Sequence, residues 1–132
     1  MKIDMPREWL KSSKLDLENI QYILEAEHLT SIVAFHAQQS IEKSFKAVIE
    51  YQDKKIPKQH DLLKLKNMIA DVLPVENDDM LDSLNALYLE SRYPGELGLL
   101  PYGKPTLEDA QEFYATALKI FEDVCTLLNI KI

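Results

Sequence analysis

Arg92 is the residue of this chain whose type and position best suit anion chemistry. It lies in the stretch ESRYP, at the expected end of a helix and the start of an irregular segment. A guanidinium holds a phosphate or carboxylate through two parallel hydrogen bonds. A cation is also favourable at a helix C-terminus, where Arg92 can pair with Glu90 or Glu42. Two interpretations follow: an anion or nucleotide contact by Arg92 and Tyr93, or a structural ion pair.

Lysines concentrate in the middle of the chain. Between residues 43 and 66, seven lysines against three acids give a local balance of +4, whereas the whole chain carries −7. From residue 71 onward, twelve acids against four bases give −8. The lysines form either a solvated face or a patch that attracts phosphate or a partner protein. Lys43 and Lys46 are the two that we expect to face outward toward such a ligand.

The stretch VAFHAQQSIEKSFKAVIEY, residues 33–51, carries more polar side chains than a plain core helix needs. On a helical wheel, Gln38 falls inside the apolar arc and Glu42 at its border. A buried amide without partners costs about 1–3 kcal/mol. We therefore expect Gln38 and Glu42 to form a polar network against the fourth helix, with Glu42 paired to Arg92. The residues expected on the opposite, solvated arc are His36, Gln39, Lys43, Lys46 and Glu50.

His60 and Asp61 are a second polar pair, and we include both in the predicted network. Adjacent helical residues point apart, so an acid–base pair is disfavoured. We expect Asp61 in the first turn of a helix and His60 packed or hydrogen-bonded at the junction. The chain has no HxxxH or HxxE spacing, so no metal site is predicted. It also lacks a GxxxxGK[ST] loop, which excludes the P-loop nucleotide hydrolases.

Apolar residues recur at three- and four-residue spacing along most of the chain, which predicts an all-α fold. We expect one domain over residues 1–132, an up-down bundle of four long antiparallel helices plus one short helix. Residues 93–105 hold all three glycines and three of the six prolines, and a loop of this length is usually functional or mobile. The first predicted helix begins near Pro6, and the second spans roughly residues 31–52. The third runs from His60-Asp61 to Pro74, and the fourth spans about 77–91. The last begins after Thr106, its predicted N-cap.

The composition is that of an ordinary globular protein, with 46% hydrophobic and 28% charged residues. No apolar run approaches the roughly 18 residues of a membrane span, and the N-terminus lacks a secretory signal. Cys125 is the single cysteine, so no internal disulfide forms, and a reducing cytoplasm is expected. We predict that Cys125 is a buried structural thiol.

Four segments together resemble the HEPN domain family: FHAQQSIEKSFKAVI, QHDLLKL, YLESRYP and PTLEDAQEFYATA. They occur in the family's order and cover about residues 5–128. The resemblance implies a helical bundle that is commonly a homodimer. It also implies pairing with a minimal nucleotidyltransferase, often in toxin–antitoxin or defence systems. Many members of the family are metal-independent ribonucleases.

The ribonuclease signature of that family is an arginine followed, after four to six residues, by a histidine. Arg92 stands at the arginine position, but residues 97–99 are Leu, Gly and Leu, and no histidine lies in the segment. A general base must be within hydrogen-bond reach of the proton that it takes. We therefore expect a non-catalytic protein, a homodimer that binds a nucleotidyltransferase partner.

The expected ligand is an ATP-like nucleotide or RNA, held by Lys43, Lys46, Arg92 and Tyr93, without a cofactor or metal. Two alternatives stay open. One is a ribonuclease toxin that uses Arg92 with a displaced base, His36 or His60. The other is a dimeric structural scaffold.

Overall fold

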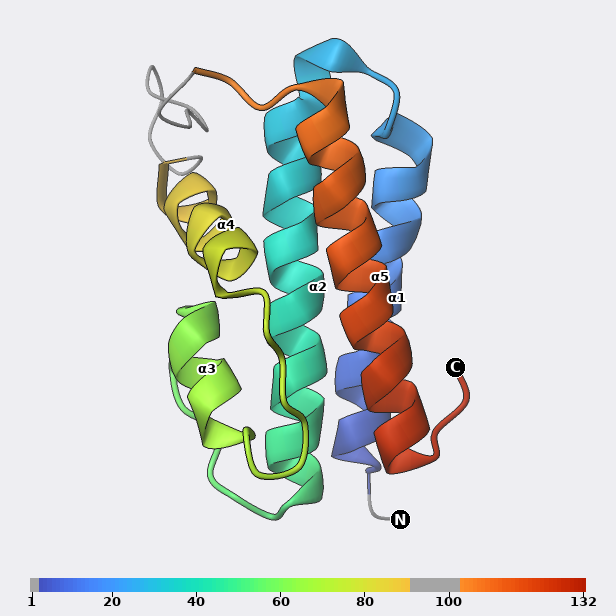
Figure 1. The fold of residues 1–132 in the computed structure, drawn as a ribbon. Coiled ribbons are helices and arrows are strands. Elements are labelled where there is room, and N and C mark those ends of the chain that lie inside the picture. Colours follow the sequence, from blue (N-terminus) through green and yellow to red (C-terminus); the bar gives the residue numbers. More distant parts are fainter. Residues whose placement is uncertain (1–2, 91–102) are drawn as a thin grey trace.

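A computed structural model describes residues 3–90 and 103–132 of the chain (Figure 1). In Figure 1 the four longer helices run alternately up and down, so that α1 begins at the end of the bundle where α5 ends. The predicted fold class, an all-α up-down bundle of four long helices plus a short one, is confirmed. The helices are α1 (Met5–Ile23), the 3-10 helix η1 (Glu27–Leu29), α2 (Thr30–Tyr51), α3 (Leu62–Met68), α4 (Asp78–Glu90) and α5 (Leu107–Leu128).

Helix α2 lies at the centre of the bundle and packs against each of the other four α-helices (Figure 1). Its small residues Ala34, Ala37 and Ser40 are fully buried, so neighbouring helices approach closely. At Ser40 the contact is polar, because the hydroxyl of Ser13 on α1 donates to the Ser40 carbonyl at 2.9 Å. The largest fully buried apolar side chains of the core are Leu10, Ile20, Ile41, Phe45, Ile49, Leu62, Leu65, Ile69, Leu81, Leu84 and Leu87.

The helix starts follow their capping residues. Asp4 caps α1 by accepting a hydrogen bond from the Arg7 backbone N–H at 3.3 Å. Thr106 caps α5 in a reciprocal capping box with Asp109, in which each side chain accepts from the other residue's backbone N–H. These bonds satisfy N–H groups that a helix start otherwise leaves without partners. The predicted N-cap at Thr106 is confirmed.

The end of α3 differs from the prediction. We expected this helix to continue to Pro74, but it ends at Met68. At Ile69 the backbone hydrogen bond changes from the helical pattern to a tighter turn, because the Ile69 N–H donates to the Lys66 carbonyl. A second turn follows, in which Val72 and Leu73 both donate to the Ile69 carbonyl. Helical apolar spacing therefore continues past the point where the backbone stops being helical.

The predicted solvated arc of α2 is the larger error. The side chain of Lys46 is only 8% exposed, and its Nζ lies 2.9 Å from the Glu42 carboxylate. Lys43 and His36 are partly buried and both pair with Asp16 of α1. A helical wheel assumes that one face of a helix meets solvent, whereas α2 is enclosed by α1, α3, α4 and α5. Its polar residues therefore pair with one another and with α1.

Two further observations concern the single cysteine and the possibility of a membrane-spanning helix. Cys125 is partly buried against the core, and burial raises the pKa of its thiol. Across the ranges 3–90 and 103–132, no helix combines the length and apolar character needed to cross a membrane.

Replacement of Thr106 by alanine should lower the free energy of unfolding by about 0.5–2 kcal/mol, because the Asp109 N–H loses its acceptor. Thr126→Ala is the matched control, since Thr126 is exposed in the same helix, α5. It should change stability by less than about 0.5 kcal/mol. Urea denaturation followed by circular dichroism measures both. Equal losses in the two variants would contradict the capping assignment.

Replacement of Lys46 by methionine should destabilise the fold by about 3–5 kcal/mol, because Glu42 would keep its buried charge without its cation. Lys119→Met is the matched control. Lys119 and Asp123 form an ion pair with the same four-residue spacing on the exposed surface of α5. Solvent screens such a pair, so its loss should not measurably shift the urea midpoint. A Lys46→Met variant as stable as the wild type would show that the buried pair contributes nothing.

Candidate functional site

The carboxylate of Glu42 is the centre of the predicted polar network. Only 6% of its side chain is exposed, and both oxygens accept hydrogen bonds. Oε2 accepts from Lys46 Nζ at 2.9 Å. Oε1 accepts from Gln38 Nε2 at 3.2 Å and contacts His60 Nδ1 at 2.9 Å. The structure thus brings together three of the four residues predicted for the network, Gln38, Glu42 and His60, and adds Lys46.

Gln38 is fully buried, and its amide is satisfied on both sides. Its Nε2 also donates to the His60 backbone carbonyl at 2.9 Å, and its Oε1 accepts from Gln39 Nε2 at 2.7 Å. The amide of Gln38 therefore fixes the backbone of the loop that precedes α3 against α2. This contact explains why a glutamine occupies an apolar position of the central helix.

The contact with Glu42 determines which nitrogen of the neutral His60 ring carries the proton. An ionised carboxylate only accepts hydrogen bonds, and the other Glu42 oxygen accepts from the ammonium of Lys46. His60 Nδ1 must therefore be the donor. In the neutral ring, the lone pair then lies on Nε2, which points away from the buried carboxylate. The side chain of His60 is 54% exposed, and the residue lines a pocket.

A pocket of about 270 Å³ lies beside His60. The ring of Tyr88, on α4, is 5.5 Å from the His60 ring and is stacked on Phe35 of α2 at 5.7 Å. The pocket thus combines an aromatic wall, an imidazole, a lysine, a carboxylate and two amides. Its lining residues are Lys58, Gln59, His60, Asp61, Asn85, Tyr88 and Leu89.

Asp61 lies at the start of α3, but as its N-cap and not in the first turn, where we expected it. The Asp61 Oδ1 accepts from the Leu63 backbone N–H at 2.9 Å. The same oxygen accepts from Asn85 Nδ2 at 2.8 Å, and Asn85 Oδ1 accepts from the Leu62 N–H at 2.9 Å. Asp61 and Asn85 therefore connect the start of α3 to α4, and both line the pocket. Asp61 makes no hydrogen bond to the His60 ring.

A second polar cluster was missed by sequence reasoning. Asp16 of α1 is 7% exposed, and it contacts Lys43 Nζ at 2.7 Å and His36 Nδ1 at 2.9 Å. A signal was present, because Asp16 falls between Ser13 and Leu17 on the buried face of α1. A carboxylate in such a stripe requires a cation from the facing helix. Lys43 is therefore engaged by Asp16 and is not the outward-facing lysine that we expected.

The other lysines of the basic segment differ in exposure: Lys66 is largely buried, whereas the remaining four are exposed. Lys54 donates to the Met68 carbonyl, and Lys66 pairs with Asp78. Lys55, Lys58 and Lys64 are exposed. The positive charge available to a ligand thus lies in the segment between α2 and α3 and in the first turn of α3. Of these three lysines, Lys58 lines the His60 pocket.

Two predicted site residues, Arg92 and Tyr93, lie outside the described residues. The predicted ion pair between Glu42 and Arg92 therefore also lies outside them. The partners that the structure gives to Glu42 are Lys46, His60 and Gln38.

Lys46 has one further neighbour, the indole of Trp9. Its Nζ lies 5.5 Å from the centre of the Trp9 ring, within the range of a cation–π contact. The Trp9 Nε1 is buried and has no hydrogen-bond partner among the described residues. The polar network therefore extends from the pocket at His60, through Glu42 and Lys46, to an aromatic ring of α1.

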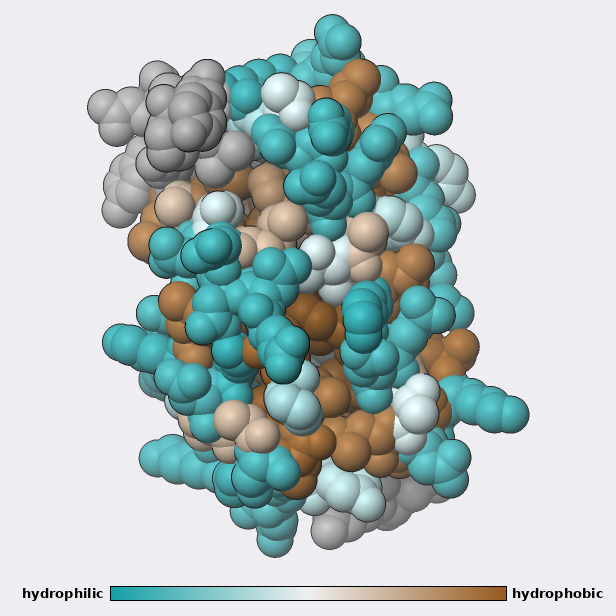
Figure 2. Space-filling view, viewed as in Figure 1, coloured by the Kyte–Doolittle hydropathy of each residue, from teal (hydrophilic) through white to brown (hydrophobic). Residues whose placement is uncertain are grey.

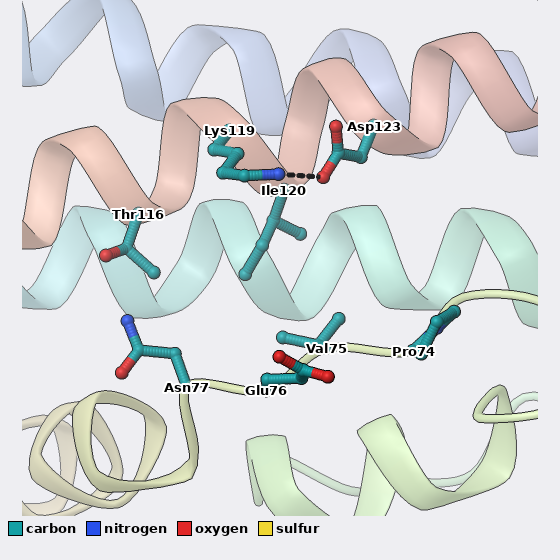
Figure 3. Close-up of a pocket in the computed structure, with 8 residues that line it drawn as sticks. All are labelled: Pro74, Val75, Glu76, Asn77, Thr116, Lys119, Ile120 and Asp123. Atoms are coloured by element: carbon teal, nitrogen blue, oxygen red, sulfur yellow. Dashed lines mark hydrogen bonds and ion pairs between the residues drawn. The ribbon is translucent and has the colours of Figure 1, made fainter.

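A larger pocket beside α5 has fewer polar groups available to a ligand. Polar side chains cover most of the face in Figure 2, with apolar ones showing between them. A pocket of about 440 Å³ lies between residues 74–77 and α5. Figure 3 shows its lining side chains, with Ile120 pointing toward Val75. The Lys119 ammonium pairs with Asp123 at 2.8 Å, which raises the pKa of Lys119. These two charges on the pocket wall thus satisfy each other.

A model of the HEPN domain family matches residues 6–128. Two solved structures share the fold. TT1696 from Thermus thermophilus is 24% identical, with a TM-score of 0.74 over 95% of this chain and 99% of that one. ST0689, an archaeal HEPN homologue, is 23% identical, with a TM-score of 0.63 over 96% of this chain and 98% of that one.

No protein with a curated description matches the chain. The family model covers nearly all of the sequence, including α1 to α5 and the loop that carries His60. The chain therefore belongs to the HEPN domain family.

Proposed function

We propose that this chain is a non-catalytic HEPN protein that binds an ATP-like nucleotide at the His60 pocket, as a homodimer paired with a nucleotidyltransferase-domain protein in the cytoplasm. The observation that carries the ligand proposal is the ring of His60, half-exposed at a pocket and held in one orientation by the buried Glu42. The partner and the dimer rest on the family resemblance, in which such pairing is frequent.

The chemistry of the pocket suits the two ends of a nucleotide. The lone pair of His60 Nε2 accepts a hydrogen bond, as from the amino group of adenine. The exposed ammonium of Lys58 attracts phosphate. A volume of about 270 Å³ is slightly below the usual range for ligand pockets, so we expect the base to enter and the phosphates to remain at the rim. Lys46, buried and paired, is not part of this proposal.

Titration calorimetry with ATP tests the binding proposal. Lys58→Ala should weaken binding about tenfold, equivalent to about 1.4 kcal/mol, because it removes the cation at the pocket. His60→Gln should weaken binding to a similar degree, because it removes the ring that is held by Glu42.

Lys64→Ala is the matched control, since Lys64 is exposed in the same basic segment but does not line the pocket. It should change affinity less than about twofold, through the general field alone. Equal losses for Lys58→Ala and Lys64→Ala would indicate non-specific attraction. No binding by the wild type would leave the dimeric scaffold as the remaining non-catalytic function.

One observation favours ribonuclease activity as a second candidate. A carboxylate that holds Nδ1–H leaves Nε2 as a proton acceptor, which is the arrangement of a general base. His60 would then supply the base that residues 93–105 lack, with Arg92 as the anion-binding partner. This candidate requires that RNA reach both groups.

Incubation with single-stranded RNA in the presence of EDTA tests this candidate. If it holds, RNA is cleaved without metal, and His60→Gln and Arg92→Ala each abolish cleavage. His28→Gln is the control, because His28 is exposed in η1, before α2 begins, and should not affect the rate. Intact RNA after incubation with the wild-type protein would exclude this function.

A further inference from the structure

We propose that Nε2 of His60 is a phosphoryl-acceptor site, which takes a phosphoryl group from a small donor of the acyl-phosphate or phosphoramidate class. The acceptor uses the pocket of the proposed function but requires neither nucleotide binding nor RNA cleavage. It rests on the orientation, exposure and charge environment of one imidazole.

The orientation comes from Glu42. Its Oε1 lies 2.9 Å from His60 Nδ1 and accepts the proton there, so the reactive lone pair of the neutral ring is on Nε2. A carboxylate on the opposite nitrogen also increases the electron density of the ring, as it does for metal-binding histidines. The His60 carbonyl is fixed by Gln38 Nε2 at 2.9 Å, which limits the movement of the loop. The nucleophile is therefore preorganised.

His60 combines a carboxylate on Nδ1 with an exposed side chain, and each of the other two histidines of the chain lacks one of these two features. His28 is exposed but makes no hydrogen bond or ion pair with a carboxylate in the described part of the chain. His36 is held by Asp16, but its side chain is only 22% exposed. His60 combines a carboxylate on Nδ1 with 54% exposure. The three histidines of one protein can therefore be compared to separate the effect of solvent exposure from that of a carboxylate on Nδ1.

Two charged side chains line the pocket, Lys58 and Asp61, and the Asp61 carboxylate accepts hydrogen bonds from the Leu63 N–H and from Asn85 Nδ2. Lys58 lines the pocket, and its ammonium attracts the oxygens of a phosphoryl group. The negative charge of Glu42 is already paired with Lys46 at 2.9 Å, which reduces its repulsion of the donor. The aromatic ring of Tyr88 forms one wall beside the imidazole. A volume of about 270 Å³ admits a small phosphorylated molecule.

The phosphoryl transfer needs no reactant besides His60 and the phosphoryl donor. The lone pair of Nε2 attacks phosphorus and forms a P–N bond. The P–O bond of an acyl phosphate breaks and its carboxylate leaves; with phosphoramidate, the P–N bond of the donor breaks and ammonia leaves. The positive charge that develops on the ring remains next to the Glu42 carboxylate, and the Nδ1–H proton stays between them.

The experiment incubates the full chain with potassium phosphoramidate at mildly alkaline pH and follows each histidine by mass spectrometry. We expect His60 to be phosphorylated at least about fivefold faster than His28, the rate gain that corresponds to a hydrogen bond of about 1 kcal/mol. Phosphorus NMR should place the group on Nε2. Equal rates at His60 and His28, or modification of His60 on Nδ1, would overturn the proposal.

Glu42→Gln keeps the size of the side chain and removes its charge, so it should reduce the rate at His60 to that at His28. Because this variant can lose stability, its fold is checked by circular dichroism, and the comparison within the wild type stands without it. The ATP titration separates the two proposals. Nucleotide binding without phosphorylation of His60 removes the acceptor role alone, and phosphorylation without nucleotide binding removes the binding function alone.

Discussion

The buried carboxylate of Glu42 is the constraint on which the rest of the structure depends. A charge removed from water is tolerated only when it is paired and its hydrogen bonds are completed. Here Lys46 neutralises one oxygen, and Gln38 and His60 occupy the other. Because these donors come from α2 itself and from the segment before α3, the charge fixes where that segment lies. The orientation of the pocket beside His60 is a consequence of satisfying a buried acid.

Helix α2 serves both the core and this network. Its apolar residues, with Phe45 and Ile49 fully buried, are held between α1 and α5, while its polar residues meet α1 on one side and the His60 loop on the other. A bundle normally places charges on the outer face of each helix. Packing α2 against four neighbouring helices instead turns the charges of Glu42 and Lys46 inward. The stability of the fold and the geometry of the pocket are therefore coupled through one element.

The fold could be predicted largely from local rules, whereas the site could be predicted only in part. Apolar spacing and the cap at Thr106 located the helices, since both depend on neighbours in the chain. The burial of Gln38 was also foreseeable, as an amide within an apolar arc. Lys46 was misplaced because a helical wheel does not show how many neighbours enclose a helix. The pairing of Asp16 with Lys43 joins residues 27 positions apart, which no local pattern specifies.

The contact between Lys46 and Trp9 gives the protein an optical property. Trp9 is the sole tryptophan of the chain, and an ammonium lies 5.5 Å from the centre of its ring. Indole emission responds to nearby charge, and this charge is shared with Glu42, which also holds the ring of His60. The Trp9 ring therefore lies next to Lys46, which is the inner end of a hydrogen-bonded chain formed by Lys46, Glu42 and His60. The outer end of this chain, His60, lines the pocket. Events at the imidazole are accessible to an intrinsic spectroscopic probe, without any added label.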